Sequence, residues 1–325
     1  MNTMPFKAAW WFRNPHFQTI WPALFRYTPQ PDYQRQRIEL RDGDFIDIDW
    51  CGNNLHDRPV VMLLHGLEGS SDSQYIRGLA GLLSKLGWRA AAINFRGCSG
   101  EANRLARSYH SGATADLDEI VDFISQHQPE TPLHAVGFSL GGNLLLKWCA
   151  EKGNRCPLHS AVAVSVPYDL SIASQTLDRK TGIASIYRVR LLQSLKKKAL
   201  QKARQGLIEL DEPVIDDICS LAEFDQRLTA PLHGFESADD YYSRASCSPH
   251  LGKLTIPTLL IHATDDPFMD SQGIPHEADL SDSTQLELSP HGGHVGFFQP
   301  SFSNSSYWLE KRITKYLESN MKQEK

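Results

Sequence analysis

The sequence predicts an α/β fold with a mostly parallel sheet, and three observations support this class. Short, nearly continuous apolar runs recur along the chain, which is typical of strands buried on both faces. Segments of helical length separate these runs, and such alternation favours a parallel sheet. Residues 36–50 alternate instead, on both sides of the turn Asp42-Gly43-Asp44. This pattern predicts an antiparallel hairpin ahead of the parallel strands.

The apolar runs define the remaining strands in chain order. They cover Pro59–Leu64, Arg89–Phe95, Leu133–Phe138, Ser160–Val166 and Thr258–His262, with a further strand near Gln285–Leu288. The segments between and after them predict helices at Gln74–Leu86, Thr114–Gln126 and Leu140–Glu151, and around Ser306–Glu318.

The alternation of strands and helices stops after Pro167, because residues 170–250 contain sequence typical of helices and no strand-like run. This segment follows one strand and precedes another, so we expect it at the C-terminal edge of the sheet, where ligands bind in open α/β sheets. We therefore interpret residues 1–325 as a single domain with a helical cap at about 170–250. Apolar positions of the cap would form one wall of a pocket, or pack only as core: Ile186, Val189, Leu191 and Leu192.

Composition limits the class of protein. An apolar fraction of 41% in 325 residues supplies a sizeable core, and the net charge of −5 excludes a dedicated nucleic-acid binder. No run approaches the ~18 apolar residues of a membrane-spanning helix, so we expect no integral membrane segment. The six cysteines form no CxxC pair, and the first residues lack the apolar core of a secretory signal. We expect a reducing, cytoplasmic location.

The first 25 residues are rich in aromatic side chains, including Trp10, Trp11 and Trp21. We expect this segment to pack on the rest of the protein, with contact to a membrane surface as the alternative.

The strongest motif for chemistry is Gly137-Phe138-Ser139-Leu140-Gly141. It overlaps the end of the predicted buried strand LHAVGF and leads into a predicted helix. A strand–turn–helix with serine at the corner is a nucleophile elbow. The helix N-terminus would favour negative charge beside Ser139. The alternative is a turn in which Ser139 serves only as a helix N-cap.

A nucleophilic serine needs a base, and the base needs an orienting acid. His291 and His294 both follow the last predicted strand, where the chain order Ser…Asp…His places the base. Asp265 and Asp266 follow the strand before it, and we prefer Asp266 because Pro267 holds it in extended geometry. A metal site at the two histidines is the alternative, but a third ligand and an HExxH signature are missing.

An oxyanion needs preorganised N–H donors. We expect one from Leu140, next to the nucleophile, and one from the loop after an early strand. That loop begins His65-Gly66-Leu67-Glu68-Gly69, and the N–H of Leu67 is our candidate. We expect His65 to brace the loop.

These motifs resemble the α/β-hydrolase superfamily, and more closely the YheT-type branch of bacterial hydrolases, which is related to eukaryotic ABHD1- and ABHD3-like esterases and acyltransferases. The resemblance covers residues 14 to about 310. Its matching text is Asn14–Thr19, His65–Gly69, Phe95–Gly100, Tyr109–Gly112, Gly137–Asn143, Asp265–Met269 and His291–Phe297. The triad of this branch corresponds to Ser139, Asp266 and His294, which selects His294 over His291. The eukaryotic relatives look membrane-anchored at the N-terminus and this chain does not, so their lipid substrates do not transfer automatically.

The sequence therefore predicts a carboxylesterase-like serine hydrolase that acts on a small acyl ester through a Ser139 acyl-enzyme. This chemistry requires no metal and no organic cofactor. One alternative is an acyltransferase, in which an alcohol intercepts the same acyl-enzyme. Another is a non-catalytic ligand-binding module on the same scaffold, which a broken triad would indicate.

Overall fold

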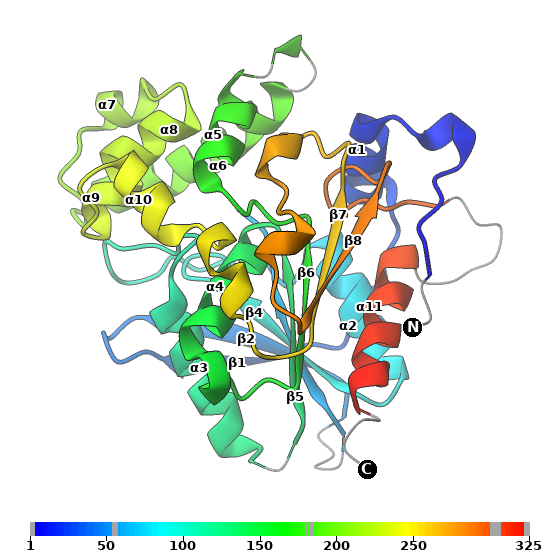
Figure 1. The fold of residues 1–325 in the computed structure, drawn as a ribbon. Helices are drawn as coiled ribbons and strands as arrows, with labels where there is room; N and C mark the ends of the chain where they lie inside the picture. The colour runs from blue at the N-terminus through cyan, green and yellow to red at the C-terminus, as the bar shows by residue number, and fades with distance from the viewer. Residues whose placement is uncertain are drawn as a thin grey trace.

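A computed structural model describes residues 4–53, 58–129, 131–179, 181–182, 185–299 and 307–321. Within these residues the strands form one sheet in the order β1-β2-β4-β3-β5-β6-β7-β8 (Figure 1). The strands are β1 (Gln34–Glu39), β2 (Phe45–Cys51), β3 (Val60–Leu64), β4 (Arg89–Asn94), β5 (Leu133–Phe138), β6 (Ser160–Val164), β7 (Thr258–Ala263) and β8 (Thr284–Ser289). Strand β2 is antiparallel to both of its neighbours, and all other pairs are parallel. The predicted α/β class and its N-terminal hairpin are confirmed.

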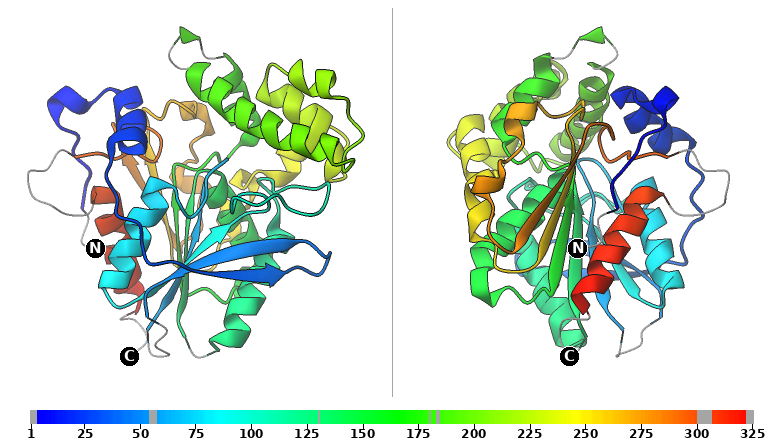
Figure 2. Two further views of the ribbon diagram at one scale, coloured as in Figure 1. Left: turned by 180° about the vertical axis from the view of Figure 1, so that it is seen from behind. Right: turned by 45° about the vertical axis from the view of Figure 1, so that its right-hand side comes forward.

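Helices cover both faces of the sheet (Figures 1 and 2). Helices α3 (Thr114–His127) and α4 (Leu140–Lys152) lie on one face, and α2 (Gln74–Lys85) and α11 (Trp308–Met321) on the other. Helices α2, α3 and α4 begin at their predicted first residues and end within one residue of their predicted last residues. The predicted start of the terminal helix, Ser306, lies outside the described residues.

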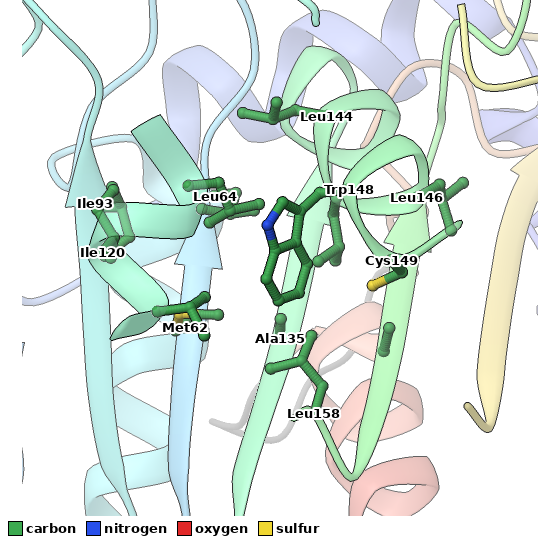
Figure 3. Close-up of a cluster of buried hydrophobic side chains, with 14 of the residues drawn as sticks. Met62, Leu64, Ile93, Ile120, Ala135, Leu144, Leu146, Trp148, Cys149 and Leu158 are labelled. Carbon is green, nitrogen blue, oxygen red and sulfur yellow. The ribbon is translucent and has the colours of Figure 1, made fainter. Parts of the chain in front are cut away.

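The core beneath α4 fixes the position of the helix. Figure 3 shows the indole of Trp148 among side chains of the sheet and of α4 itself, including Leu64, Ala135 and Leu144. Trp148 is 1% exposed, and its Nε1–H donates to Asp118 Oδ1 at 3.2 Å. Because α4 begins directly after residue 139, this packing also holds the turn that carries Ser139.

A helical insertion separates β6 from β7 and lies at the carboxyl end of the sheet (Figure 1). Its helices are α5 (Leu170–Arg179), α6 (Ser185–Arg204), α7 (Glu212–Asp216), α8 (Leu221–Phe224), η4 (Asp225–Thr229), α9 (Ala230–Leu232), α10 (Ala238–Ala245) and η5 (Ser248–Lys253). The insertion has an apolar cluster of its own, which includes Leu192. Leu191 lines a cavity, whereas Ile186 and Val189 are exposed, so the predicted apolar stripe divides among three environments.

A short N-terminal helix, α1 (Pro15–Phe25), follows the single turn η1 (Trp10–Phe12). Helix α1 was not expected from the sequence, although the segment carries a recognisable start signal. Asn14 Oδ1 accepts hydrogen bonds from the N–H groups of His16 and Phe17, and proline occupies the first helical position. The segment packs on the protein through Gln18 and Pro22, as expected, but most of its aromatic side chains are exposed.

The cysteines and the lengths of the helices bear on the redox state and on membrane insertion. All six cysteines are free. In the described part of the chain, every helix is too short or too polar to cross a bilayer.

Candidate active site

Ser139 occupies the corner between β5 and α4 in a left-handed backbone conformation, with φ of 50° and ψ of −120°. Its N–H donates to the carbonyl of Val164 at 2.8 Å, which ties the corner to β6. The flanking glycines permit the tight turn. A Cβ atom at Gly137 would lie 2.5 Å from the carbonyl oxygen of Gly141, and one at Gly141 would lie 2.5 Å from that of Leu64. The G-x-S-x-G spacing therefore follows from the close passage of α4 over the strands.

A chain of hydrogen bonds runs from Ser139 to a buried carboxylate. Nε2 of His294 lies 3.0 Å from Ser139 Oγ, and Nδ1 of His294 lies 2.8 Å from Asp266 Oδ2. The other carboxylate oxygen of Asp266 accepts the N–H of Phe268 at 2.8 Å, and the Asp266 side chain is 1% exposed. A carboxylate at Nδ1 favours the tautomer in which Nε2 is free to accept the serine proton.

The rival histidine and aspartate form a separate pair. His291 Nδ1 lies 3.3 Å from Asp265 Oδ2, and the N–H of Gly293 donates to Asp265 Oδ1 at 3.0 Å. Burial raises the pKa of Asp265 above its usual value, whereas the His291 side chain is 36% exposed. The structure thus brings Ser139, Asp266 and His294 together and leaves the other two outside this chain of bonds. The described residues hold no group of three or more metal-ligating side chains.

Helix α1 holds the loop that carries His294. The N–H of His294 donates to Thr19 Oγ1 at 2.9 Å. The amide of Gln18 exchanges hydrogen bonds with the backbone of Phe298, with its Nε2–H donating at 3.1 Å and its Oε1 accepting at 2.7 Å. The ring of Phe268 stacks on the imidazole of His294, with centroids 4.1 Å apart. The sequence alone assigned no role to these residues, although Gln18, Thr19 and Phe268 lie within segments that carry the family resemblance.

The expected oxyanion donors belong to the loop after β3 and to the start of α4, and a Cβ atom at Gly66 in that loop would lie 3.1 Å from Ser139 Cβ. The N–H groups of Gly66 and Glu68 donate to tyrosine hydroxyls at 3.0 and 2.8 Å. The N–H of Leu67, between them, has no acceptor among the described residues. The N–H of Leu140 belongs to the first residue of α4, where a helix offers no internal acceptor. Leu67 and Leu140 both line the cavity that contains Ser139.

His65 is fully buried at the end of β3. Its Nδ1 lies 2.7 Å from the carbonyl of Gly66, and its Nε2 accepts the N–H of Phe95 at 3.2 Å. Burial lowers the pKa of His65 to about 4. The neutral ring therefore braces the loop that presents Leu67.

Glu68 connects the same loop to the helical insertion, and sequence reasoning missed it. Its backbone has a φ of 56°, and its carboxylate accepts hydrogen bonds from Tyr109 at 2.8 Å and from the hydroxyl of Ser194 on α6. Glu68 lies beside the candidate oxyanion donor Leu67. A contact on α6 can therefore influence the position of that donor.

A cavity of about 790 Å³ opens above Ser139, and its surface is mostly apolar. Small-molecule sites in proteins have volumes of roughly 300–1,000 Å³. The helices of the insertion form one wall and α1 contributes to another. The apolar side chains on the insertion side include Leu177, Leu191, Leu195, Leu221 and Leu228.

Known proteins resemble this chain in sequence or in fold. A family model described as the alpha/beta hydrolase fold matches residues 59–181. "Putative esterase YheT" of Escherichia coli (strain K12) is 40% identical over 316 residues, which cover 95% of this chain and 92% of that protein. "Phospholipase ABHD3" of Mus musculus is 31% identical over 320 residues, covering 95% and 77%. The solved structure of the Pyrococcus furiosus esterase Pf2001 shares the fold with a TM-score of 0.58 at 16% identity, covering 90% of this chain and 99% of that one.

Proposed function

The chain belongs to the α/β-hydrolase family, in the branch that contains YheT and ABHD3, and from this premise we propose that it hydrolyses carboxylic esters through an acyl-enzyme on Ser139. The observation that carries the proposal is the chain of hydrogen bonds from Ser139 through His294 to Asp266 at the cavity. A serine is a weak nucleophile until a base takes its proton, and His294 is within reach to do so.

In the first half of the reaction, Ser139 Oγ attacks the ester carbonyl carbon while His294 Nε2 takes the hydroxyl proton. The carbonyl oxygen gains negative charge, which the N–H groups of Leu67 and Leu140 stabilise. Asp266 stabilises the imidazolium. The tetrahedral intermediate then collapses, the C–O bond to the alcohol breaks, and His294 gives its proton to the departing alkoxide.

In the second half, water takes the place of the alcohol. His294 removes a proton from the water as it attacks the acyl carbon, and the same two N–H groups hold the second oxyanion. Collapse of this intermediate breaks the bond to Ser139 Oγ, which recovers its proton from His294. The products are a carboxylic acid and an alcohol, and the enzyme returns to its starting state.

The cavity supports an ester with an apolar acyl group. Leucines of the insertion line it on one side, and burying an apolar chain against them would favour binding. In this reading, residues 1–325 form one hydrolase domain whose segment at about 170–250 serves as a cap.

A fluorophosphonate probe combined with p-nitrophenyl esters tests the proposal. The wild type should be labelled and should hydrolyse the esters, and Ser139→Ala should do neither. Ser160→Ala is the matched control, because Ser160 Oγ also lies beside a histidine, 2.8 Å from His134 Nδ1, but at the start of β6, and this variant should still be labelled. A wild type that is never labelled, or that transfers the acyl group to an added alcohol faster than to water, would overturn ester hydrolysis as the function.

A further inference from the structure

Among the residues that the structure describes, large apolar side chains are exposed mainly in two segments. Seven of them lie between residues 10 and 27, and two more lie at the start of α6. We call these nine residues the apolar rim: Trp10, Trp11, Phe17, Trp21, Leu24, Phe25, Tyr27, Ile186 and Val189. Trp10 is 75% exposed and Phe25 is 64% exposed. Apolar side chains gathered in this way on a surface indicate an interaction site.

Helix α1 presents its apolar face outward. Phe17, Trp21, Leu24 and Phe25 recur at helical spacing and are exposed, whereas Gln18 is fully buried. Surface helices ordinarily bury the apolar stripe and expose the polar one. The reversed orientation is fixed by Gln18, because its amide makes three hydrogen bonds to the backbone of Phe12 and Phe298. The outward apolar face is therefore built into the fold.

The two parts of the rim form one surface beside the cavity. His16 Nδ1 on α1 lies 3.0 Å from the hydroxyl of Tyr187 on α6, and their rings are stacked. Both helices lie at the carboxyl end of the sheet (Figures 1 and 2). Leu24 belongs both to the rim and to the lining of the cavity above Ser139.

The segments that carry the rim contain basic and no acidic residues, although the net charge of the whole chain is −5. Residues 4–31 contain no Asp or Glu, and neither does α6. Exposed basic side chains lie within these segments at Lys7, Arg13 and Arg190. An apolar surface with basic neighbours complements an anionic lipid surface, at whose interface Trp and Tyr are enriched.

We propose that the apolar rim docks this protein on the surface of an anionic phospholipid bilayer. The exposed side chains of α1 and the start of α6 would enter the interface, and the neighbouring basic groups would contact lipid phosphates. The mouth of the cavity would then face the bilayer. Docking does not depend on the chemistry of Ser139, so this inference stands apart from the proposed hydrolysis.

Vesicle flotation and tryptophan fluorescence test the docking surface. The wild type should float with vesicles of equal parts phosphatidylglycerol and phosphatidylcholine, and less with phosphatidylcholine alone. Added salt should weaken the binding, because the attraction to anionic lipid is electrostatic. The emission should shift to the blue on binding, and the shift would report Trp10, Trp11 and Trp21, because the other four tryptophans are buried.

The double variant Trp21→Ser/Phe25→Ser should bind anionic vesicles at least tenfold more weakly, with an unchanged Tm, because both side chains are exposed. The matched control is Leu86→Ser/Leu288→Ser, which removes the two exposed leucines that the described residues hold outside the rim, and it should bind like the wild type. Ser139→Ala should also bind normally, which separates docking from catalysis. Equal binding by the rim variant and the wild type would overturn the proposal. A second result would also overturn it: light scattering shows that the wild type is a dimer that does not bind vesicles, and that the rim variant is a monomer. The rim would then be an interface between two copies.

Discussion

Glu68 and Lys198 form an ion pair that joins the candidate oxyanion loop to helix α6 of the insertion, with Lys198 Nζ 2.9 Å from Glu68 Oε1. The Glu68 side chain is 6% exposed and that of Lys198 is 34% exposed. Burial alone would lower the pKa of Lys198, but the neighbouring Cys98 and Glu68 raise it overall, so the amine stays charged. The pair therefore links the position of α6 to that of Leu67.

Breaking this pair should slow catalysis more than it weakens substrate binding. In Glu68→Gln the loop loses its charged contact to α6, and we expect kcat to fall roughly tenfold or more, because a displaced oxyanion donor stabilises the transition state less. KM should change little. The double variant Glu68→Gln/Lys198→Met leaves no orphan charge and should recover part of kcat. A lower Tm with unchanged kcat and KM would show that the pair only holds the insertion in place.

His294, and not His291, should be the general base. We expect His294→Ala to reduce ester hydrolysis by roughly 10³-fold or more, as the loss of a triad member does. His291→Ala should stay within about threefold of the wild type, because its ring pairs with Asp265 and is partly exposed. Steady-state kinetics on one p-nitrophenyl ester compare the two variants. The assignment is wrong if His291→Ala is the inactive one.

The two adjacent aspartates should differ in the same way. Asp266→Asn replaces the acceptor of His294 Nδ1–H by a group that can stabilise the wrong tautomer, and kcat should drop by roughly 10³–10⁴-fold. Asp265→Asn keeps an oxygen for the N–H of Gly293, so its effect should be small. Circular dichroism confirms that both variants fold. Equal losses in the two variants would contradict separate roles.

Leu191 and Leu192 are neighbours on α6 that both contact the apolar cluster of the insertion, but of the two Leu191 alone lines the cavity, which makes a matched pair. Leu191 lines the cavity, so Leu191→Ala should lower kcat/KM for a long-chain ester about tenfold more than for an acetate, close to the burial energy of a partial leucine contact. Leu192 lies in the apolar cluster of the insertion, so Leu192→Ala should lower the free energy of unfolding by about 2–5 kcal/mol and leave chain preference unchanged. If both variants only lower Tm, the insertion does not select the acyl chain.

Asp225 should make the insertion less stable as pH rises. Burial raises the pKa of Asp225 from 3.8 to about 6, although its oxygens accept hydrogen bonds from Thr229 at 2.6 Å and Tyr242 at 2.7 Å. Between these two values the folded chain holds a proton that the unfolded chain has released. The contribution of this proton to the free energy of unfolding is therefore fully present below about pH 4 and is lost as pH rises through about 6.

Asp225→Asn tests this prediction, because asparagine stays neutral at every pH. Its Tm should exceed that of the wild type at pH 8, by an amount that corresponds to at most roughly 3 kcal/mol for two pKa units. The advantage should shrink as the pH falls to 4.5. A difference in Tm that does not depend on pH would show that Asp225 titrates normally.

Much of the fold could be predicted because its signals are local. The buried strands read as continuous apolar runs, and the interval without such runs marks the insertion between β6 and β7. Helix α1 was not predicted, even though Asn14 and Pro15 form a typical helix N-terminus. Its apolar residues do not face the core, so a method that looks for a buried apolar helix face does not detect it.

The sequence by itself determined the position of Ser139, because strand, turn and helix are adjacent in the chain and the two glycines are required by their close packing. It reduced the base and the acid to two neighbouring pairs of residues, and within them Pro267 favoured Asp266 and the family resemblance favoured His294. Only the tertiary structure gives the hydrogen bonds that pair His294 with Asp266 and His291 with Asp265, because these depend on how the loops after β7 and β8 approach the end of β5. It alone brought Glu68 to Lys198 and turned Gln18 inward. These contacts join residues far apart in the chain, and no local pattern records the distance between them.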